Sequence, residues 1–183
     1  MNEVKKMPEL GFGEALKQAM DKLTQFSGRS RRSEFWWCML AVIIANVVLS
    51  FIPFIGSIRS LLLSLAVIPL TFRRLHDTGR SGWWCGIGVI GTIIGYGVIA
   101  YNLVDVIGSD MLMEIAKGEV SDPTEIADTI TNSSAGFLPM TISYLIGMAY
   151  NIMMIVFMCL DSQVGTNKYG PSPKYMEQGE INN

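Results

Sequence analysis

Residues 35–58 read FWWCMLAVIIANVVLSFIPFIGSI, a stretch without a single charged side chain. Two further uncharged runs of similar length follow along the chain, at Ser81–Val104 and at Gly136–Leu160. A bilayer core about 30 Å thick needs about 20 predominantly apolar helical residues, so each run is long enough to cross it. Three uncharged runs of this length are not typical of the core of a soluble domain. The sequence therefore predicts an integral membrane protein.

A fourth, shorter span is expected from Gly56 to Phe72. Arg59 is the only charged residue in this segment. At 1.5 Å per residue the segment covers about 25 Å, the low end of a spanning length. Pro53 and Gly56 before it are typical of a turn between two helices. We therefore expect an all-α membrane protein with four transmembrane helices, at about 35–55, 56–72, 82–104 and 136–160, in a single membrane domain 1–183.

Basic residues are distributed unevenly between the loops. Twelve of the 14 lysines and arginines precede the first span, lie between spans two and three, or follow span four, whereas Arg59 and Lys117 lie on the other side. The positive-inside rule then places both termini, including the tail 161–183, in the cytoplasm of a bacterial cell, with the protein multi-pass in the inner membrane. The polar segment 1–34 does not resemble a signal peptide, so the first span is expected to remain as an uncleaved anchor.

Two polar segments are expected to flank the spans. In residues 10–27, apolar side chains recur with a period close to 3.6, which predicts an amphipathic helix in the cytoplasmic interface, with a soluble helix packed on the loops as the alternative. Residues 105–135 hold seven acids against the single Lys117 and are expected to form an acidic periplasmic loop. A short helix is expected to begin near Ser121–Glu125. The acids lack the spacing of a calcium loop, which favours a solvated acidic face.

Two related motifs lie at the expected cytoplasmic ends of the spans. Residues 28–37 read GRSRRSEFWW, and residues 73–84 read RRLHDTGRSGWW. Indole rings are favoured at the membrane interface, and arginines are favoured at the depth of the lipid phosphates. The motifs therefore predict a positively charged belt whose membrane-interface anchors are Trp36, Trp37, Trp83 and Trp84.

Together with GTNKYGPSP at residues 165–173, these motifs resemble those of the YhaH-type family of bacterial inner-membrane proteins, a domain of unknown function. The resemblance covers the chain from about Phe12 to Pro173. It implies a small multi-span inner-membrane protein and supplies no reaction, substrate or catalytic residue. The acidic segment 105–135 is longer than the family usually carries and has no family guidance.

A cluster of charged residues is the candidate site at this face. The three acids are expected to pair with the arginines and tie the cytoplasmic segments together, because half-buried charges at a membrane interface need partners. A general-base role for His76 next to Asp77 is disfavoured, since adjacent loop residues rarely face each other and no nucleophile motif is present. No metal, cofactor or catalytic residue is expected. The candidate cluster comprises Arg29, Arg31, Arg32, Glu34, Arg73, Arg74, His76, Asp77, Arg80 and Asp161.

Three functional classes remain open from the sequence. The leading class is a non-enzymatic membrane protein whose basic cytoplasmic face binds anionic phospholipid or a protein partner, with no nucleic acid involved. The second is a small transporter or channel, although the spans hold almost no ionisable residue near their middles. The third is a membrane enzyme acting on phosphorylated lipids. The spacing Gly91-x-x-x-Gly95 permits close helix packing within one chain or in a homo-oligomer.

Overall fold

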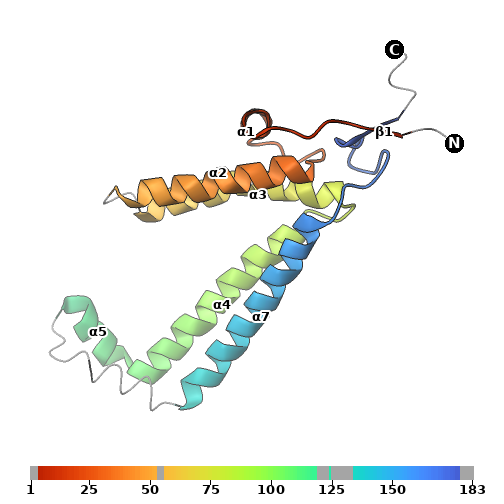
Figure 1. The fold of residues 1–183 in the computed structure, drawn as a ribbon. Coiled ribbons are helices and arrows are strands. Elements are labelled where there is room, and N and C mark those ends of the chain that lie inside the picture. The colour runs from red at the N-terminus through yellow and green to blue at the C-terminus, as the bar shows by residue number, and fades with distance from the viewer. Residues whose placement is uncertain (1–3, 53–55, 119–123, 125–133, 178–183) are drawn as a thin grey trace. The chain divides into compact units, whose positions relative to one another are not determined.

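The computed structural model describes residues 4–52, 56–118, 124 and 134–177, which are mostly helical (Figure 1). The expected helix start at Ser121–Glu125 lies largely outside these residues. The chain divides into two compact units, unit 1 with Met1–Gly86 and Met154–Asn183, and unit 2 with Ile87–Met153. In chain order the named elements are β1 (Val4–Lys6), α1 (Phe12–Asp21), α2 (Arg32–Ser50), α3 (Gly56–Asp77), α4 (Trp83–Ile107), α5 (Ser109–Lys117), α7 (Ser134–Cys159) and β2 (Tyr175–Glu177).

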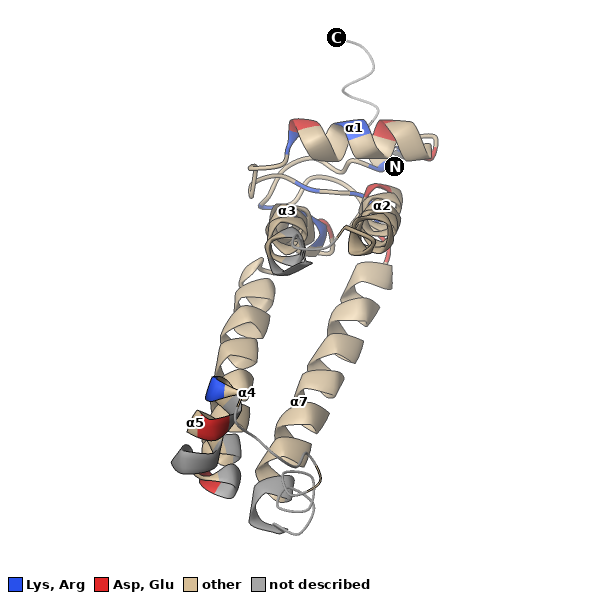
Figure 2. Ribbon diagram, turned by 90° about the vertical axis from the view of Figure 1, so that its left-hand side faces the viewer, with Lys and Arg blue, Asp and Glu red and all other residues tan. Residues whose placement is uncertain are grey.

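Among the described residues, three helices are long and apolar enough to cross a membrane. They are α2, α4 over Trp83–Asn102, and α7 over Leu138–Cys159, and they match three of the four expected spans. Figure 2 shows α7 without a charged residue along its described length. The helix α3 covers the fourth expected span and continues past it to Asp77, so it carries Arg73 and Arg74 in its last turn and a half. A membrane crossing by α3 remains a prediction.

Unit 1 has a small core formed where α1, α2 and α3 meet. The helix α1 packs on α2 through Ala15 and Ala19, and the Trp37 indole N–H on α2 donates to the Leu10 carbonyl at 3.1 Å. The helices α2 and α3 lie side by side (Figure 1). The cluster of buried apolar residues at the centre of this unit consists of Ala19, Phe35, Cys38, Leu70, Leu75 and Met158. The core therefore draws on residues from both ends of the sequence.

The two ends of the described chain pair as a short antiparallel ribbon. In β1 and β2, Val4 is opposite Glu177 and Lys6 is opposite Tyr175, and the N–H of Met7 extends the pairing to the Lys174 carbonyl at 2.9 Å. The all-α prediction is wrong in this detail, because three-residue strands are too short to show a period of two. Residues 161–177 are accordingly not a free tail.

Unit 2 consists of most of α4, α5 and most of α7. A Cβ atom at Gly88 on α4 would overlap the Tyr150 ring on α7, so these two helices approach closely there. In contrast, a Cβ placed at Gly91 or Gly95 would meet no described atom of another helix within 4 Å. The expected loop 105–135 begins with helix, because α4 continues to Ile107 and α5 occupies Ser109–Lys117.

Candidate functional site

The end of α3 is defined by a glycine turn. Gly79 has φ of +75°, and the N–H of Arg80 donates to the Leu75 carbonyl at 2.8 Å, as in a Schellman motif. The Gln163 N–H donates to the Asp77 carbonyl at 3.0 Å, so the C-terminal segment lies against this turn. A Cβ at Gly79 would overlap the side-chain amide of Gln163. Glycine is therefore required both for the backbone conformation and for the approach of residue 163.

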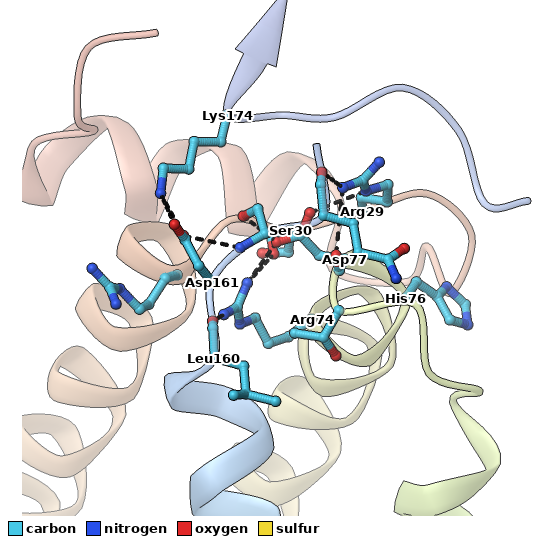
Figure 3. A network of polar contacts seen from close by, with 12 residues as sticks. Arg29, Ser30, Arg74, His76, Asp77, Leu160, Asp161 and Lys174 are labelled. Carbon is cyan, nitrogen blue, oxygen red and sulfur yellow. Dashed lines mark hydrogen bonds and ion pairs between the residues drawn. The ribbon is translucent and has the colours of Figure 1, made fainter. Parts of the chain in front are cut away.

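Asp77 is completely buried and is bound by donors from three segments (Figure 3). Its Oδ1 accepts from Arg29 Nε at 3.0 Å, and its Oδ2 accepts from Arg74 Nη1 at 2.5 Å and from the Ser162 hydroxyl at 2.5 Å. An ionised carboxylate only accepts hydrogen bonds, which fits these three donors. We call Arg29, Arg74, Asp77 and Ser162 the Asp77 cluster.

Arg74 also caps the C-terminal end of α7. Its Nε and Nη2 donate to the Met158 carbonyl at 3.2 and 3.1 Å, and Nη2 also donates to the Leu160 carbonyl. The last carbonyls of a helix lack intrahelical donors and carry partial negative charge, so a guanidinium is well suited to bind them. Arg74 thereby links the last turn of α3 to the end of α7.

Arg29 organises the segment that follows α7. Its Nη1 donates to the Gly165 carbonyl at 2.7 Å and to the Gly170 carbonyl at 3.3 Å, and its Nη2 donates to the Gln163 carbonyl at 2.5 Å. Its side chain is 1% exposed and bridges to Asp77. The glycine-rich motif at residues 165–170 is therefore folded around one guanidinium.

A second buried ion pair joins α2 to α3. Arg73 Nη2 lies 3.4 Å from Glu34 Oε1, and both side chains are almost completely buried. Arg73 Nη1 donates to the Lys22 carbonyl at 3.2 Å, which attaches the segment after α1. The expected pairing of Glu34 and Asp77 with arginines is thus present, and Arg29, Arg73 and Arg74 are used inside the protein.

Burial and charge act in opposite directions on the Asp77 cluster. Burial raises the pKa of the Asp77 carboxyl above its ordinary value, whereas the Ser162 hydrogen bond and the guanidinium groups of Arg74 and Arg29 lower it. Burial also lowers the pKa of Arg74, and Asp77 opposes that shift. Removal of Asp77 would therefore leave two desolvated guanidinium groups without their carboxylate.

His76 does not face Asp77 (Figure 3). Its Nδ1 lies 3.1 Å from the Gly28 carbonyl, which requires a proton on Nδ1, and its ring stacks on Tyr169 with centroids 3.7 Å apart. Burial lowers its pKa, which favours the neutral imidazole. The structure thus shows no His–Asp dyad at residues 76 and 77. Within the described parts of the chain, no group of three or more His, Cys, Asp or Glu residues could hold a metal ion.

Asp161 pairs with a lysine, and the prediction that it pairs with an arginine is wrong. Lys174 donates to both of its carboxylate oxygens, and the Tyr175 hydroxyl donates to Oδ2 at 3.2 Å. These contacts lower the pKa of Asp161 to about 2, with the Lys174 hydrogen bond as the main cause. Because its side chain is 51% exposed, Asp161 lies outside the buried network.

The other three arginines of the candidate cluster, Arg31, Arg32 and Arg80, have different surroundings. The Arg80 guanidinium lies over the Phe157 ring at 4.1 Å. Arg32 is exposed, with Nη1 3.5 Å from the Cys159 carbonyl. Arg31 is 6% exposed, and its side chain forms no hydrogen bond or ion pair with another described residue. Arg31 is thus mostly buried, with its guanidinium nitrogens open to a pocket and bound to no described residue.

The four tryptophans do not share one environment. Trp36, Trp37 and Trp83 are 39%, 38% and 72% exposed, as an interface anchor requires. Trp84 is half-buried and packs edge-to-face on Phe157, with ring centroids 5.6 Å apart. Anchoring by the three exposed indoles remains a prediction.

Several contact residues were not singled out from the sequence. Ser162, Gln163, Asn167 and Tyr169 all contribute to the network, and Asn167 Nδ2 donates to the His76 carbonyl at 3.0 Å. The motif at residues 165–173 contains two of these residues, Asn167 and Tyr169, and could have pointed to them. Ser162 and Gln163 lie before that motif and gave no signal.

Comparisons with known proteins agree with the helical pattern. A family model described as "Protein of unknown function (DUF805)" matches residues 23–171. The inner membrane protein YhaI of Escherichia coli (strain K12) is 39% identical over 67 residues, which is 32% of this chain and 57% of that protein. The inner membrane protein YhaH of the same strain is 34% identical over 89 residues, which is 42% of this chain and 74% of that protein. The match with YhaI thus spans less than two thirds of its length. No solved structure matches the chain.

Proposed function

The chain belongs to the DUF805 family of proteins of unknown function, and from this premise we propose that it is a non-enzymatic, multi-pass inner-membrane protein whose cytoplasmic face attaches to anionic lipid. Its relatives YhaI and YhaH are inner membrane proteins, which supports the location. In the proposed arrangement α2, α3, α4 and α7 cross the bilayer, α1 lies in the cytoplasmic interface, and both termini are cytoplasmic.

The Asp77 cluster is the observation that carries this proposal. The two residues considered for catalysis, His76 and Asp77, are both occupied by structural contacts. Asp77 is bound by Arg29, Arg74 and Ser162. His76 contacts the Gly28 carbonyl and the Tyr169 ring. A general base must be able to reach a proton on a substrate. A completely buried carboxylate with three donors is better suited to holding segments together than to acid–base chemistry.

Charge distribution supports the orientation. The proposed cytoplasmic segments hold 12 of the 14 basic and nine of the 16 acidic residues, while the opposite side holds Arg59, Lys117 and seven acids. A crossing by α3 is needed to keep Arg73, Arg74 and Arg80 on the basic side. The exposed Phe12 and Met20 on α1, at 42% and 65%, supply an apolar surface for the interface.

The structure narrows which arginines can reach lipid. Arg29, Arg73 and Arg74 are buried against acids, so three of the six arginines in the motifs 28–37 and 73–84 are unavailable to a headgroup. Attachment therefore depends on Arg31, Arg32, Arg80 and the surface lysines. Each basic residue near an anionic surface contributes about 1 kcal/mol of attraction, so a few such residues are sufficient for a preference.

Two measurements test the proposal. Reporter fusions after Glu34, Gly79, Glu119 and Tyr175 should read inside, inside, outside and inside, and an outside signal at Gly79 would contradict the crossing by α3. Native mass spectrometry of the detergent-solubilised protein should show more retained phosphatidylglycerol than phosphatidylcholine. Equal retention of both lipids would overturn the attachment to anionic lipid.

A further inference from the structure

A pocket of about 190 Å³ lies at the start of α2, within unit 1 and outside the Asp77 cluster. Three cationic side chains line it, those of Arg31, Arg32 and Lys174. Ser33 and Trp36 add a hydroxyl and an indole from the first turn of the helix. At roughly 30 Å³ per water molecule, this volume can hold a phosphate group with part of its hydration shell.

Arg31 is the principal sign that the pocket takes an anion. Its side chain is nearly as buried as those of Arg29 and Arg74, yet those two guanidinium groups are bound by Asp77 and by several carbonyls. The Arg31 side chain forms no hydrogen bond or ion pair with any other residue that the structure describes. The guanidinium nitrogens of Arg31 are open to the pocket, so an anion there would replace water as their partner.

The first turn of α2 provides further unused donors. The Ser33 hydroxyl oxygen is buried without a hydrogen-bond partner among the described residues. The first helical hydrogen bond runs from the Phe35 N–H to the Arg31 carbonyl, so the N–H groups of residues 32–34 precede the helical ladder, and Arg31 supplies no side-chain cap. Such a helix start favours a bound anion. The Glu34 carboxylate in the first turn does not serve as that anion, because it pairs with Arg73.

Both acids of the pocket already have cationic partners. Asp161 is bound by Lys174, and Glu9 lies 3.8 Å from Lys6 Nζ. With Arg31, Arg32 and Lys174 against Glu9 and Asp161, the lining of the pocket carries a formal net charge of +1.

We propose that this pocket binds a phosphate group, with the Arg31 guanidinium as its main contact and the Ser33 hydroxyl and the first N–H groups of α2 as further donors. The identification of the source rests on the proposed function. The half-exposed Trp36 and the apolar surface of α2 lie next to the cations, which suits the headgroup phosphate of an inner-leaflet phospholipid. Inorganic phosphate shares this chemistry and serves as the second arm of the test.

The test uses the full chain in mild detergent after removal of bound lipid. Binding of phosphatidylglycerol and phosphatidylcholine is measured by native mass spectrometry, and binding of inorganic phosphate by the rise in the apparent unfolding temperature. Losing a hydrogen bond to a charged group weakens binding about 10-fold or more, so Arg31→Gln should lower the affinity for the preferred ligand by that factor. Ser33→Ala should lower it a few-fold. Lys117→Gln, which removes one positive charge from an exposed position at the end of α5, should bind as the wild type does.

The arms distinguish the two sources. The ligand is a lipid if phosphatidylglycerol binding depends on Arg31 and inorganic phosphate has no effect. The ligand is soluble if only the effect of inorganic phosphate on the unfolding temperature depends on Arg31. If Arg31→Gln does not fold, Ser33→Ala decides. Unchanged affinity for every ligand in the folded Arg31 and Ser33 variants overturns the pocket, and the general lipid attachment survives if phosphatidylglycerol is still preferred. Conversely, equal binding of both lipids by the wild type overturns the attachment, while the pocket stands if inorganic phosphate still depends on Arg31.

Discussion

Unit 1 and unit 2 bury different kinds of residue. In unit 1 the largest completely buried side chains are Arg73, Arg74, Leu75 and Asp77. In unit 2, side chains such as Ile93 on α4 and Leu145 on α7 are 67% and 50% exposed, and none of the apolar window Trp83–Asn102 is buried. Charged groups thus hold unit 1 together. The exposed apolar side chains of unit 2, and those on α2 in unit 1 such as Val47 at 57%, require an apolar surrounding.

A membrane accounts for this difference. Lipid chains are as apolar as leucine, so apolar residues facing lipid gain nothing by burial against another helix. A charge near the bilayer, in contrast, requires a partner or water. The three interior ion pairs of unit 1, with side chains at most 3% exposed, satisfy that requirement.

The largest expected effect is that of Asp77→Ala. Leaving one partner of a buried ion pair without the other costs about 3 to 5 kcal/mol, and here two guanidinium groups lose their carboxylate. The apparent unfolding temperature in mild detergent, followed by tryptophan fluorescence, should fall steeply. The control is Asp161→Ala, whose exposed pair with Lys174 is expected to contribute at most about 1 kcal/mol. Similar losses in the two variants would mean that the Asp77 cluster is not the main support of unit 1.

A smaller effect is expected when the same substitution is made in each unit. Leu75 is completely buried in unit 1, so Leu75→Ala should cost about 2 to 5 kcal/mol of unfolding free energy. Leu145 is 50% exposed in unit 2, so Leu145→Ala should stay within about 0.5 kcal/mol. Detergent unfolding of both variants measures the difference. A cost at Leu145 equal to that at Leu75 would show that another surface covers α7, such as a second copy of the chain.

The smallest expected effect is a pH dependence from His76. Burial lowers its folded pKa below the ordinary value of 6.5, and the nearby charge of Lys168 adds to the shift. The unfolded chain therefore takes up the proton first, so this contribution to stability is complete above about pH 6.5 and is lost as the pH falls toward the folded pKa. Asp161, with a pKa of about 2, stays ionised over this range.

Unfolding temperatures at pH 7.5 and 5.5 measure this dependence. Wild type should lose more stability between the two values than His76→Gln does. An identical loss in both proteins would assign the pH dependence to other groups.

Local sequence was sufficient to locate most of the helices. The runs that begin at Phe35, Ser81 and Gly136 became α2, α4 and α7, because a long apolar stretch is visible without knowledge of any partner. The ribbon of β1 and β2 was missed because its stability comes from pairing the two ends of the chain. The end of α3 also differs from the prediction, because the helix continues five residues past the expected end of the span, from Phe72 to Asp77. The glycine turn that ends it, at Gly79, lies against Gln163, which is distant in sequence.

By itself the sequence determined the apolar helices and the segments that carry the charged motifs, because these are properties of composition along a single stretch. Only the tertiary structure decided which charge binds which. Arg29 and Asp77 are 48 positions apart, Asp161 takes Lys174, and Arg31 keeps no described partner although it lies two residues from Arg29. An ion pair depends on distance and desolvation in three dimensions, and residue spacing within a motif encodes neither.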